Sequence, residues 1–337
     1  MKKKFIDKKP FFIAELSGNH GGKLSVAKKI IKKAKKGGAD AVKLQTYSPE
    51  TMTLNNNYKI KTGLWKNYDL WKLYEKAHTP YKWHKILFNY AKKHKIKIFS
   101  TPFSVSDLNF LEKLNCSIYK VASFEITDLN LIKKIAMTKK PMIISTGLAS
   151  IKEVNRAFLT AKKNGCKDIT LLYCVSNYPS NTSDFNLEYI KFLKKKFKCR
   201  VGISDHSIGD TIPKLAVAYG AEVVEKHIAL KNFKTVDYKF SLKENEIKNF
   251  SDGLKNVYKI TTNKDFKRSK SEMKNIFLRR SIYALKNIKK GETFNEKNIA
   301  SLRPNLGLCA SNYLNILGKK SPINIKKYDV LSKNFKI

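Results

Sequence analysis

Eight short runs rich in β-branched and aromatic residues alternate with longer segments of helical period between residues 11 and 227. Such alternation is typical of a parallel sheet built from βα units, in which each helix returns the chain to the start of the next strand. The first helical segment is clear, since residues 27–34 place alanine and isoleucine at i, i+3, i+4 and i+7 with lysines on the opposite face. The predicted strands span residues 11–16, 41–45, 97–101, 118–123, 141–146, 168–174, 200–206 and 221–227.

Eight is the number of strands that closes a (β/α)8, or TIM, barrel, and this is the fold that the sequence predicts. An open doubly wound sheet is the alternative, because spacing alone does not prove closure. The barrel is expected to span residues 1–260, followed by a linker at 261–279 and a small domain at 280–337 that begins with a strand at 281–284. A unit of roughly 60 residues is marginal for an independent core, so it is expected to lean on the barrel or on a partner chain.

Each predicted strand becomes polar or charged at its C-terminal end. A (β/α)8 barrel carries its active site at the rim formed by these ends, so the polar groups are predicted to converge on one mouth. They are Glu15, Asn19 and His20; Lys43, Gln45 and Thr46; Ser100 and Thr101; Lys120, Ser123 and Glu125; Ser145 and Thr146; Ser176, Asn177 and Tyr178; Ser204, Asp205 and His206; and Glu225, Lys226 and His227.

Two histidines end neighbouring strands of the predicted barrel. His206 follows the seventh strand and His227 ends the eighth. Two imidazoles with open remaining positions suit a divalent Mn, Zn, Fe or Co ion that acts as a Lewis acid. The alternative, a hydrogen-bonded core or surface group, is the expectation for the other histidines, such as His78, His84 and His94.

Two lysines, Lys43 and Lys120, lie inside predicted strands, where a buried ammonium is costly without an anion. One interpretation is an internal salt bridge to Glu15 or Glu125. The other is a clamp for a phosphate and a carboxylate, assisted by polar groups at other strand ends, and it leaves the two glutamates for acid/base work or for sugar hydroxyls. The assisting groups are Thr101, Ser145, Asn177 and Ser204.

The net charge of +41 raises the question of a polyanionic partner. Only six of the 68 basic residues are arginine, however, and lysines recur at helical surface positions along the whole chain. Base readout and bidentate phosphate clamps favour arginine, so a solvated lysine-rich surface is expected, with a polyanion-binding protein as the alternative. The five cysteines show no CxxC spacing and no apolar run could span a bilayer, which predicts a cytoplasmic protein with neither a nucleic acid nor a membrane as partner.

These strand ends resemble the ordered motifs of the sialic acid (nonulosonic acid) synthase family. The matching segments in the barrel are 14–20 (AELSGNH), 42–47 (VKLQTY), 100–103 (STPF), 119–125 (YKVASFE), 144–147 (ISTG), 176–179 (SNYP), 202–207 (GISDHS) and 225–227 (EKH). Residues 280–284 (RSIYA) and 302–304 (LRP) are similar to the family's antifreeze-like (SAF) domain. The resemblance covers nearly the whole chain. Class II aldolase-like and phosphoheptulonate-synthase-like barrels would share the lysines and the metal, but neither carries a SAF domain.

Within the family the sequence looks most like the pseudaminic acid synthases. This likeness implies a transferase that condenses phosphoenolpyruvate with 2,4-diacetamido-2,4,6-trideoxy-altrose. N-acetylneuraminate or legionaminic acid synthesis, with the same chemistry on another sugar, is the alternative. The aromatic segment 65–83 is interpreted either as a substrate loop or as ordinary helix core.

The resemblance also assigns roles to residues. It implies a divalent ion, Mn²⁺ or Mg²⁺ with Co²⁺ as a further candidate, on His206 and His227. It implies a domain-swapped homodimer in which Arg303 reaches the site of the partner subunit. Catalytic roles would fall to Glu15, Lys120, Asp237 and Glu125, the last near the catalytic water. Phosphoenolpyruvate would be bound by Lys43, Thr101, Lys120, Ser123, Ser145, Asn177 and Ser204, and the sugar by Glu15, Tyr178, Asp237 and Arg303.

Overall fold

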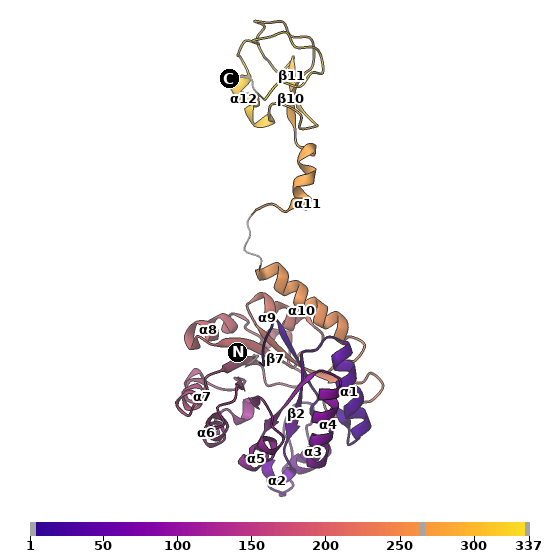
Figure 1. Ribbon diagram of the computed structural model, residues 1–337, viewed down its shortest axis with the longest axis vertical. Coiled ribbons are helices and arrows are strands. Elements are labelled where there is room, and N and C mark those ends of the chain that lie inside the picture. Colours follow the sequence, from indigo (N-terminus) through magenta and orange to yellow (C-terminus); the bar gives the residue numbers. More distant parts are fainter. Residues whose placement is uncertain (1–4, 263–266, 334–337) are drawn as a thin grey trace. The chain divides into compact units, whose positions relative to one another are not determined.

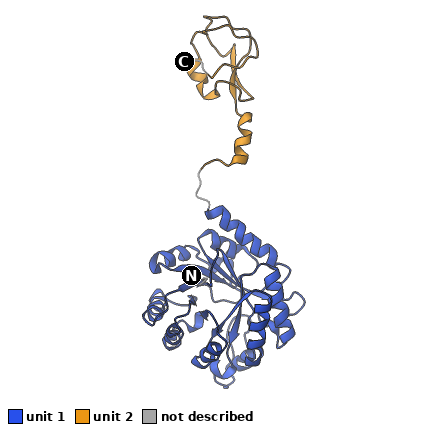
Figure 2. Ribbon diagram, viewed as in Figure 1, with its two compact units in different colours: residues 1–263 blue, residues 264–337 orange. Residues whose placement is uncertain are grey.

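The structure is a computed structural model that describes residues 5–262 and 267–333. The chain divides into two compact units, residues 1–263 and 264–337 (Figure 2). In the first unit eight parallel strands follow one another in chain order, and β1 also pairs with β8, so the sheet is closed. The (β/α)8 barrel is therefore confirmed and the open sheet is wrong. The strands are β1 (Phe11–Glu15), β2 (Ala41–Thr46), β3 (Lys97–Pro102), β4 (Tyr119–Val121), β5 (Met142–Ser145), β6 (Ile169–Cys174), β7 (Arg200–Asp205) and β8 (Val223–Ala229).

Helices surround the strands on the outside of the barrel (Figure 1). Several begin at side-chain caps that the sequence supplies, such as the capping box in which Ser150 and Glu153 satisfy each other's backbone N–H groups. Among the described residues, none of the helices is both long and apolar enough to cross a membrane. The outer helices are α1 (Leu24–Lys36), α4 (Tyr81–Lys93), α5 (Val105–Lys113), α6 (Leu129–Met137), α7 (Ile151–Lys163), α8 (Glu188–Phe197), α9 (Thr211–Ala218) and α10 (Ile247–Thr262).

Two connections at the C-terminal ends of the strands are elaborated. The segment between β2 and β3 contains the short helices α2 (Pro49–Met52) and α3 (Leu70–Ala77) before α4 begins. The segment after β8 returns through a two-residue strand, β9 (Leu242–Lys243), which pairs with Ile228 and Ala229. The sequence did not predict β9.

Register places the polar strand ends side by side inside the barrel. Glu15 of β1 is opposite Lys43 of β2 and His227 of β8. On the other side of β8, Glu225 is opposite Ser204 of β7. Because alternate residues of a strand point to opposite faces, Glu225 and His227 share the inner face while Lys226 points outward, where it bonds Asp205.

The second unit is a small β-structure with its own core. Strand β10 (Ser281–Ala284) coincides with the predicted strand and pairs antiparallel with β11 (Ile299–Leu302). Within the segment expected as a linker, α10 continues to Thr262, and α11 (Lys270–Met273) and the 3-10 helix η4 (Lys274–Leu278) precede β10, while residues 263–266 lie outside the described residues. The buried core consists of Ile282, Ala284, Ile288, Phe294, Ile299, Leu308, Ile316, Ile325 and Leu331.

Candidate functional site

A buried cluster of four charged side chains lies inside the barrel near its C-terminal end. Lys43 Nζ is 2.7 Å from Glu15 Oε2 and 3.8 Å from Glu225 Oε2, and Lys120 Nζ is 2.8 Å from Glu225 Oε1. All four side chains are at most 4% exposed. A buried charge is tolerated only when it is paired and hydrogen-bonded, and these two cations and two anions balance one another.

The environment shifts the pKa values of this cluster in different directions. Burial alone would raise the pKa of Glu225, but the adjacent Lys120 and Lys43 lower it to about 2. Burial opposes the charged form of Lys43, yet its pKa is raised because Glu15 and Glu225 stabilise the ammonium group. For Lys120, burial outweighs the attraction of Glu225 and the pKa is lowered. An added anionic ligand would oppose the effect of burial on Lys120.

The partner of Lys120 differs from the one expected. The interpretation as internal salt bridges is confirmed for Lys43 with Glu15, but Lys120 pairs with Glu225 rather than with Glu125. Sequence reasoning placed Glu225 at a strand end and gave it no role. The signal was present, because Glu225 lies two residues before His227 on one strand and therefore shares its inner face.

Hydroxyl groups surround the two lysines. Lys43 Nζ donates to Thr101 Oγ1 at 3.1 Å, and Ser204 Oγ donates to Glu225 Oε1 at 2.9 Å. Ser123 and Ser145 are buried, and Ser145 Oγ has no hydrogen-bond partner among the residues that the structure describes. A buried hydroxyl without a partner is costly and indicates a place for a ligand atom. These groups and the lysines can bind a small molecule with several anionic oxygens.

Asn177 is the member of the expected set that lies apart. It is exposed on the loop after β6, and its side-chain oxygen accepts the backbone N–H of Tyr178 at 3.0 Å. The structure therefore does not bring Asn177 into the buried cluster with the other groups of that set.

A cavity of about 320 Å³ opens beside the cluster at the C-terminal mouth of the barrel. One part of its wall is polar and comes from the strands and the loops that follow them, with Gln45, Glu125, His227 and Asp237. The other part is apolar and comes mainly from the β2–β3 segment. Its apolar residues include Met52, Ile60, Trp65, Leu70 and Leu73. The cavity therefore suits a ligand that has one polar and one apolar end.

His227 lines this cavity, and His206 lies next to it, with the two ring centroids 5.3 Å apart. Both are buried, and burial lowers the pKa of His206 well below its ordinary value, so its ring is neutral. His206 Nδ1 contacts the Val175 carbonyl at 3.2 Å, and His227 Nδ1 has no hydrogen-bond partner but lies 3.6 Å from Asp237 Oδ2. Two buried imidazoles at neighbouring strand ends fit a divalent ion. No group of three or more His, Cys, Asp or Glu side chains that could hold a metal occurs among the described residues, so other ligands of an ion would come from water or substrate.

Asp237 is held over the mouth by a network that begins at Asn19. Asn19 Nδ2 donates to the Ile228 carbonyl at 2.9 Å and to Ser241 Oγ at 2.8 Å, and Thr235 Oγ1 donates to Asn19 Oδ1. Ser241 Oγ in turn donates to the Asp237 carbonyl at 2.7 Å. The loop between β8 and β9 is therefore fixed at several points. Sequence reasoning found Asp237 only through family resemblance and gave Asn19 no specific role.

Tyr178 connects the histidines with the aromatic side chains at the mouth. Its ring centroid lies 4.3 Å from that of His206 and 5.4 Å from those of Trp65 and Phe240. Burial raises the pKa of Tyr178 well above its ordinary value, so the phenol is a neutral hydrogen-bonding group. Tyr178 and Asp237 thus both line the cavity together with His227.

Glu125 also lines the cavity, and burial raises its pKa to about 7. Its Oε2 atom is buried without a hydrogen-bond partner. A carboxyl group with a pKa near the working pH can both give and take a proton, which suits a general acid/base.

Glu125→Gln is expected to change the free energy of unfolding of the barrel differently at two pH values. Its effect should be about 2–3 kcal/mol more stabilising at pH 8 than at pH 4. The folded protein holds the proton more tightly than the unfolded chain, because the pKa rises from 4.5 to about 7. Stability of the parent protein therefore falls as pH rises through this window, and glutamine, which does not ionise, escapes the loss. Urea unfolding of both proteins at the two pH values measures the effect, and an equal difference at both would contradict it.

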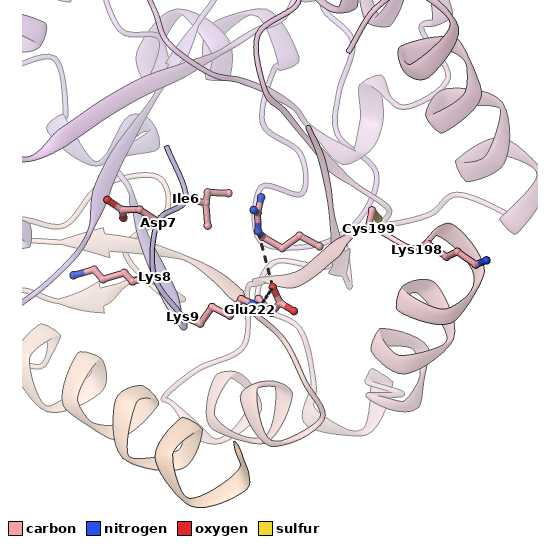
Figure 3. Close-up of a pocket in the computed structure, with 8 residues that line it drawn as sticks. Ile6, Asp7, Lys8, Lys9, Lys198, Cys199 and Glu222 are labelled. Atoms are coloured by element: carbon pink, nitrogen blue, oxygen red, sulfur yellow. Dashed lines mark ion pairs between the residues drawn. The ribbon is translucent and has the colours of Figure 1, made fainter. Parts of the chain in front are cut away.

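A second cavity of about 630 Å³ lies at the opposite end of the barrel, against the residues that precede β1 and β7 (Figure 3). Most of its charged groups are paired with one another or with nearby groups. Lys9 Nζ is 2.8 Å from Glu222 Oε2, which also lies 4.0 Å from Arg200 Nε, and Lys8 is paired with Asp40. Active sites in this fold lie at the C-terminal face of the barrel. We therefore interpret these ion pairs as structural contacts that hold the N-terminal segment against the barrel.

Arg303 belongs to the second unit. It is exposed and follows the end of β11.

The chain is similar to proteins of known activity over nearly its full length. A family model described as the NeuB family matches residues 30–266, and one described as the SAF domain matches residues 279–334. A pseudaminic acid synthase of Campylobacter jejuni subsp. jejuni serotype O:2 is 45% identical over 96% of each chain. An N,N'-diacetyllegionaminic acid synthase of the same bacterium is 40% identical over 96% of this chain and 99% of the other. A crystal structure of an N-acetylneuraminic acid synthetase from Leptospira borgpetersenii, in complex with citrate, has a TM-score of 0.72 at 33% identity and covers 80% of this chain and 90% of that one.

Proposed function

The chain belongs to the NeuB family, and from this membership we propose that it is a pseudaminic acid synthase that joins phosphoenolpyruvate to 2,4-diacetamido-2,4,6-trideoxy-altrose and releases phosphate. The observation that carries the proposal at the level of the site is the charge-balanced cluster beside a cavity with one polar and one apolar part. We also propose that this reaction takes place in the cytoplasm.

Phosphoenolpyruvate is expected to bind where Lys43, Lys120 and the buried hydroxyls meet. Its phosphate and carboxylate would supply anionic oxygens to two ammonium groups that otherwise have only Glu15 and Glu225. Charge-assisted hydrogen bonds of this kind are stronger than neutral ones and fix orientation. Ser145, whose Oγ has no partner, gains one when the ligand binds. The hydroxyls in this set are Thr101, Ser123, Ser145 and Ser204.

The sugar is expected to enter the cavity with its open-chain aldehyde toward the histidines. Carbon 3 of phosphoenolpyruvate then attacks the aldehyde carbon, whose oxygen takes up a proton. Water adds at carbon 2 and loses a proton, and phosphate leaves with cleavage of its C–O bond. Glu125, with a pKa of about 7, is the group suited to move one of these protons. Tyr178 and Asp237 would orient the sugar.

His206 and His227 would hold a divalent ion, Mn²⁺ or Mg²⁺ in the first place and Co²⁺ as a further candidate. Bound there, the ion would supply Lewis acidity toward the aldehyde oxygen. His227 supports this assignment, because its Nδ1 atom is buried without a hydrogen-bond partner.

The apolar part of the cavity supports a 6-deoxy sugar. With carbon 1 at the histidines, carbon 6 is expected at the other end of the sugar chain, against apolar lining residues such as Ile60, Trp65 and Leu70. Phe124, which is 59% exposed, extends the apolar wall on another side. A methyl group there would be buried without loss of a hydrogen bond, whereas a hydroxyl group would need a partner.

A 2,4-diacetamido-6-deoxy hexose is expected to be used with about tenfold or higher kcat/KM than N-acetylmannosamine, since burial of one methyl group accounts for roughly 1 kcal/mol and the second acylamino group adds contacts. Phosphate release from phosphoenolpyruvate across a panel of 2-acetamido and 2,4-diacetamido sugars measures this preference. Higher efficiency with N-acetylmannosamine would instead assign the chain to N-acetylneuraminate synthesis, and higher efficiency with the legionaminic acid precursor would assign it to that branch.

We also propose that two chains form a domain-swapped homodimer in which Arg303 serves the barrel of the partner subunit. Both units carry exposed apolar side chains that a dimer could bury, including Leu148 and Ile208 on the barrel loops and Phe277 and Leu306 on the second unit. An exposed guanidinium is well suited to an anionic or polar ligand.

Subunit exchange between two inactive variants tests this arrangement. Arg303→Ala and Glu125→Gln chains, mixed and allowed to exchange, should recover about a quarter of the parent activity, because half of the dimers are mixed and each has one complete site. Each variant incubated alone is the control. Demonstrated exchange without recovery would place Arg303 in its own chain's site or outside catalysis.

A further inference from the structure

Residues 58–70 form a hydrogen-bonded hairpin over the mouth of the barrel. Lys59 and Asp69 pair as an antiparallel bridge, and Ile60 N donates to the Tyr68 carbonyl at 3.0 Å. The Asn67 N–H donates back to the Ile60 carbonyl at 2.8 Å. The hairpin is further anchored where it enters α3, because the Asp69 side chain caps that helix. This segment is therefore an ordered element of the mouth.

Trp65, at the tip of this hairpin, is attached to the loop between β8 and β9. Its Nε1–H donates to the Val236 carbonyl at 3.1 Å. Val236 directly precedes Asp237, whose carboxylate lies beside His227. The Trp65 ring also stands 5.4 Å from the Tyr178 ring and 6.4 Å from the Phe240 ring. One side chain thus joins two loops that are 171 residues apart in the sequence.

The ring contacts run without interruption from Trp65 to the histidine pair. Tyr178 lies between Trp65 and His206, with centroid distances of 5.4 and 4.3 Å, and Phe240 lies 4.9 Å from His227. Trp65 is therefore separated from each histidine by one aromatic ring, and it lines the same cavity as Ile60 and Leu70. A ligand whose reacting carbon is at His206 and His227 reaches Trp65 when its chain extends past these rings.

We propose that Trp65 determines which sugar the enzyme accepts, in two separable ways. The carbon-6 end of the sugar packs against its ring, which we call the wall. Its N–H positions Asp237 through the hydrogen bond to the Val236 carbonyl, which we call the latch. The proposal rests on the proposed function, since it assigns the sugar's orientation from the place of the reaction. It adds a specificity-determining residue and a positioning role that lie outside the motifs of the strand ends.

The two roles have different consequences for substitution. Trp65→Phe keeps an aromatic wall and removes the N–H donor, so the latch alone is lost. The KM for the sugar should rise about three- to tenfold, the effect of one neutral hydrogen bond, while selectivity for carbon 6 is retained. Trp65→Ala removes both, so the preference for a 6-deoxy over a 6-hydroxy 2,4-diacetamido sugar should fall by about tenfold as well. Neither change should move the KM for phosphoenolpyruvate, whose ligands lie in the barrel.

The experiment measures kcat and KM for both sugars and for phosphoenolpyruvate in Trp65→Phe, Trp65→Ala and the control Trp71→Phe. Trp71 lies on the neighbouring helix α3 and does not line the cavity. The control should match the parent enzyme in every constant. Thermal unfolding of each variant separates a local effect from loss of the fold.

Unchanged selectivity between the 6-deoxy and 6-hydroxy sugars in Trp65→Ala would refute the role of the ring as the wall. An unchanged KM for the sugar in Trp65→Phe would refute the role of the N–H as the latch. An equal rise in the KM for phosphoenolpyruvate would overturn both, since it would indicate general distortion of the mouth. If the parent enzyme uses no 2,4-diacetamido sugar, the proposed function fails. If the enzyme uses such sugars but Trp65→Ala does not change its selectivity, the proposed function stands and only this inference is refuted.

Discussion

Lys120→Met is expected to abolish turnover and to lower the free energy of unfolding of the barrel by about 3–5 kcal/mol. The ammonium group of Lys120 lies 2.8 Å from Glu225 in a place where both side chains are at most 4% exposed. Removing the cation leaves a buried carboxylate with the Ser204 hydroxyl at 2.9 Å and Lys43 at 3.8 Å, and it removes a proposed ligand of phosphoenolpyruvate. Phosphate release and urea unfolding of the purified variant measure the two effects.

A second substitution separates stability from catalysis. Lys120→Met/Glu225→Gln removes both charges of the pair, so most of the lost stability should return while turnover stays absent. Lys248→Met, which breaks the exposed pair of Lys248 with Asp252, is the matched control and should change neither quantity measurably. Turnover by the double variant would show that Lys120 serves only to neutralise Glu225.

His206→Ala or His227→Ala should leave a folded protein whose turnover is reduced by at least about 10³-fold, since both proposed ligands of the ion are needed. Binding of Mn²⁺, followed by calorimetry, should weaken in parallel, and this readout does not depend on activity. The parent enzyme should lose activity with a chelator and regain it with added ion.

His94→Gln is the matched control for the histidine variants, because His94 follows α4 on the outside of the barrel. It should bind Mn²⁺ and turn over like the parent enzyme. Full activity of the parent enzyme in the presence of a strong chelator would refute the metal assignment, as would unchanged Mn²⁺ binding in His227→Ala.

The eight strands could be predicted because each βα unit carries its own local pattern. A hydrophobic run, a turn and an amphipathic helix are visible without knowledge of the rest of the chain. Eight such units favour closure of the sheet, and the pairing of β1 with β8 establishes it. Strand β9 could not be found this way, since its two residues, Leu242 and Lys243, are too few to show a period.

Contacts across the barrel interior were the part that the sequence left open. Glu15 and Lys43 lie on neighbouring strands in register, so their pairing needs only the strand order. Lys120 and Glu225 come from β4 and β8, which are not neighbours in the sheet. Their distance depends on how the closed barrel is staggered, and no local signal in the sequence reports this stagger.

Loops were harder still, because a loop residue's direction is not set by strand alternation. Asn177 belongs to a matching motif yet is exposed. The aromatic segment 65–83 is divided between the core and the cavity wall. Trp83 is buried against His20 at 5.3 Å as core, whereas Trp65 lines the cavity. The same residue type thus occurs in the core and in a cavity wall, and only the hairpin distinguishes the two positions.

The balanced cluster of Glu15, Lys43, Lys120 and Glu225 makes binding of an anion a form of ion exchange. An incoming phosphate or carboxylate binds ammonium groups that already have counterions. The free energy gained on binding therefore depends on how well its oxygens replace the two carboxylates. Bulk salt has little effect on such a buried exchange. The lysine-rich exterior, at a net charge of +41, instead attracts every anion from a distance and loses this attraction as salt rises. Ionic strength should therefore govern the association rate of phosphoenolpyruvate. The buried cluster should determine which anion remains bound.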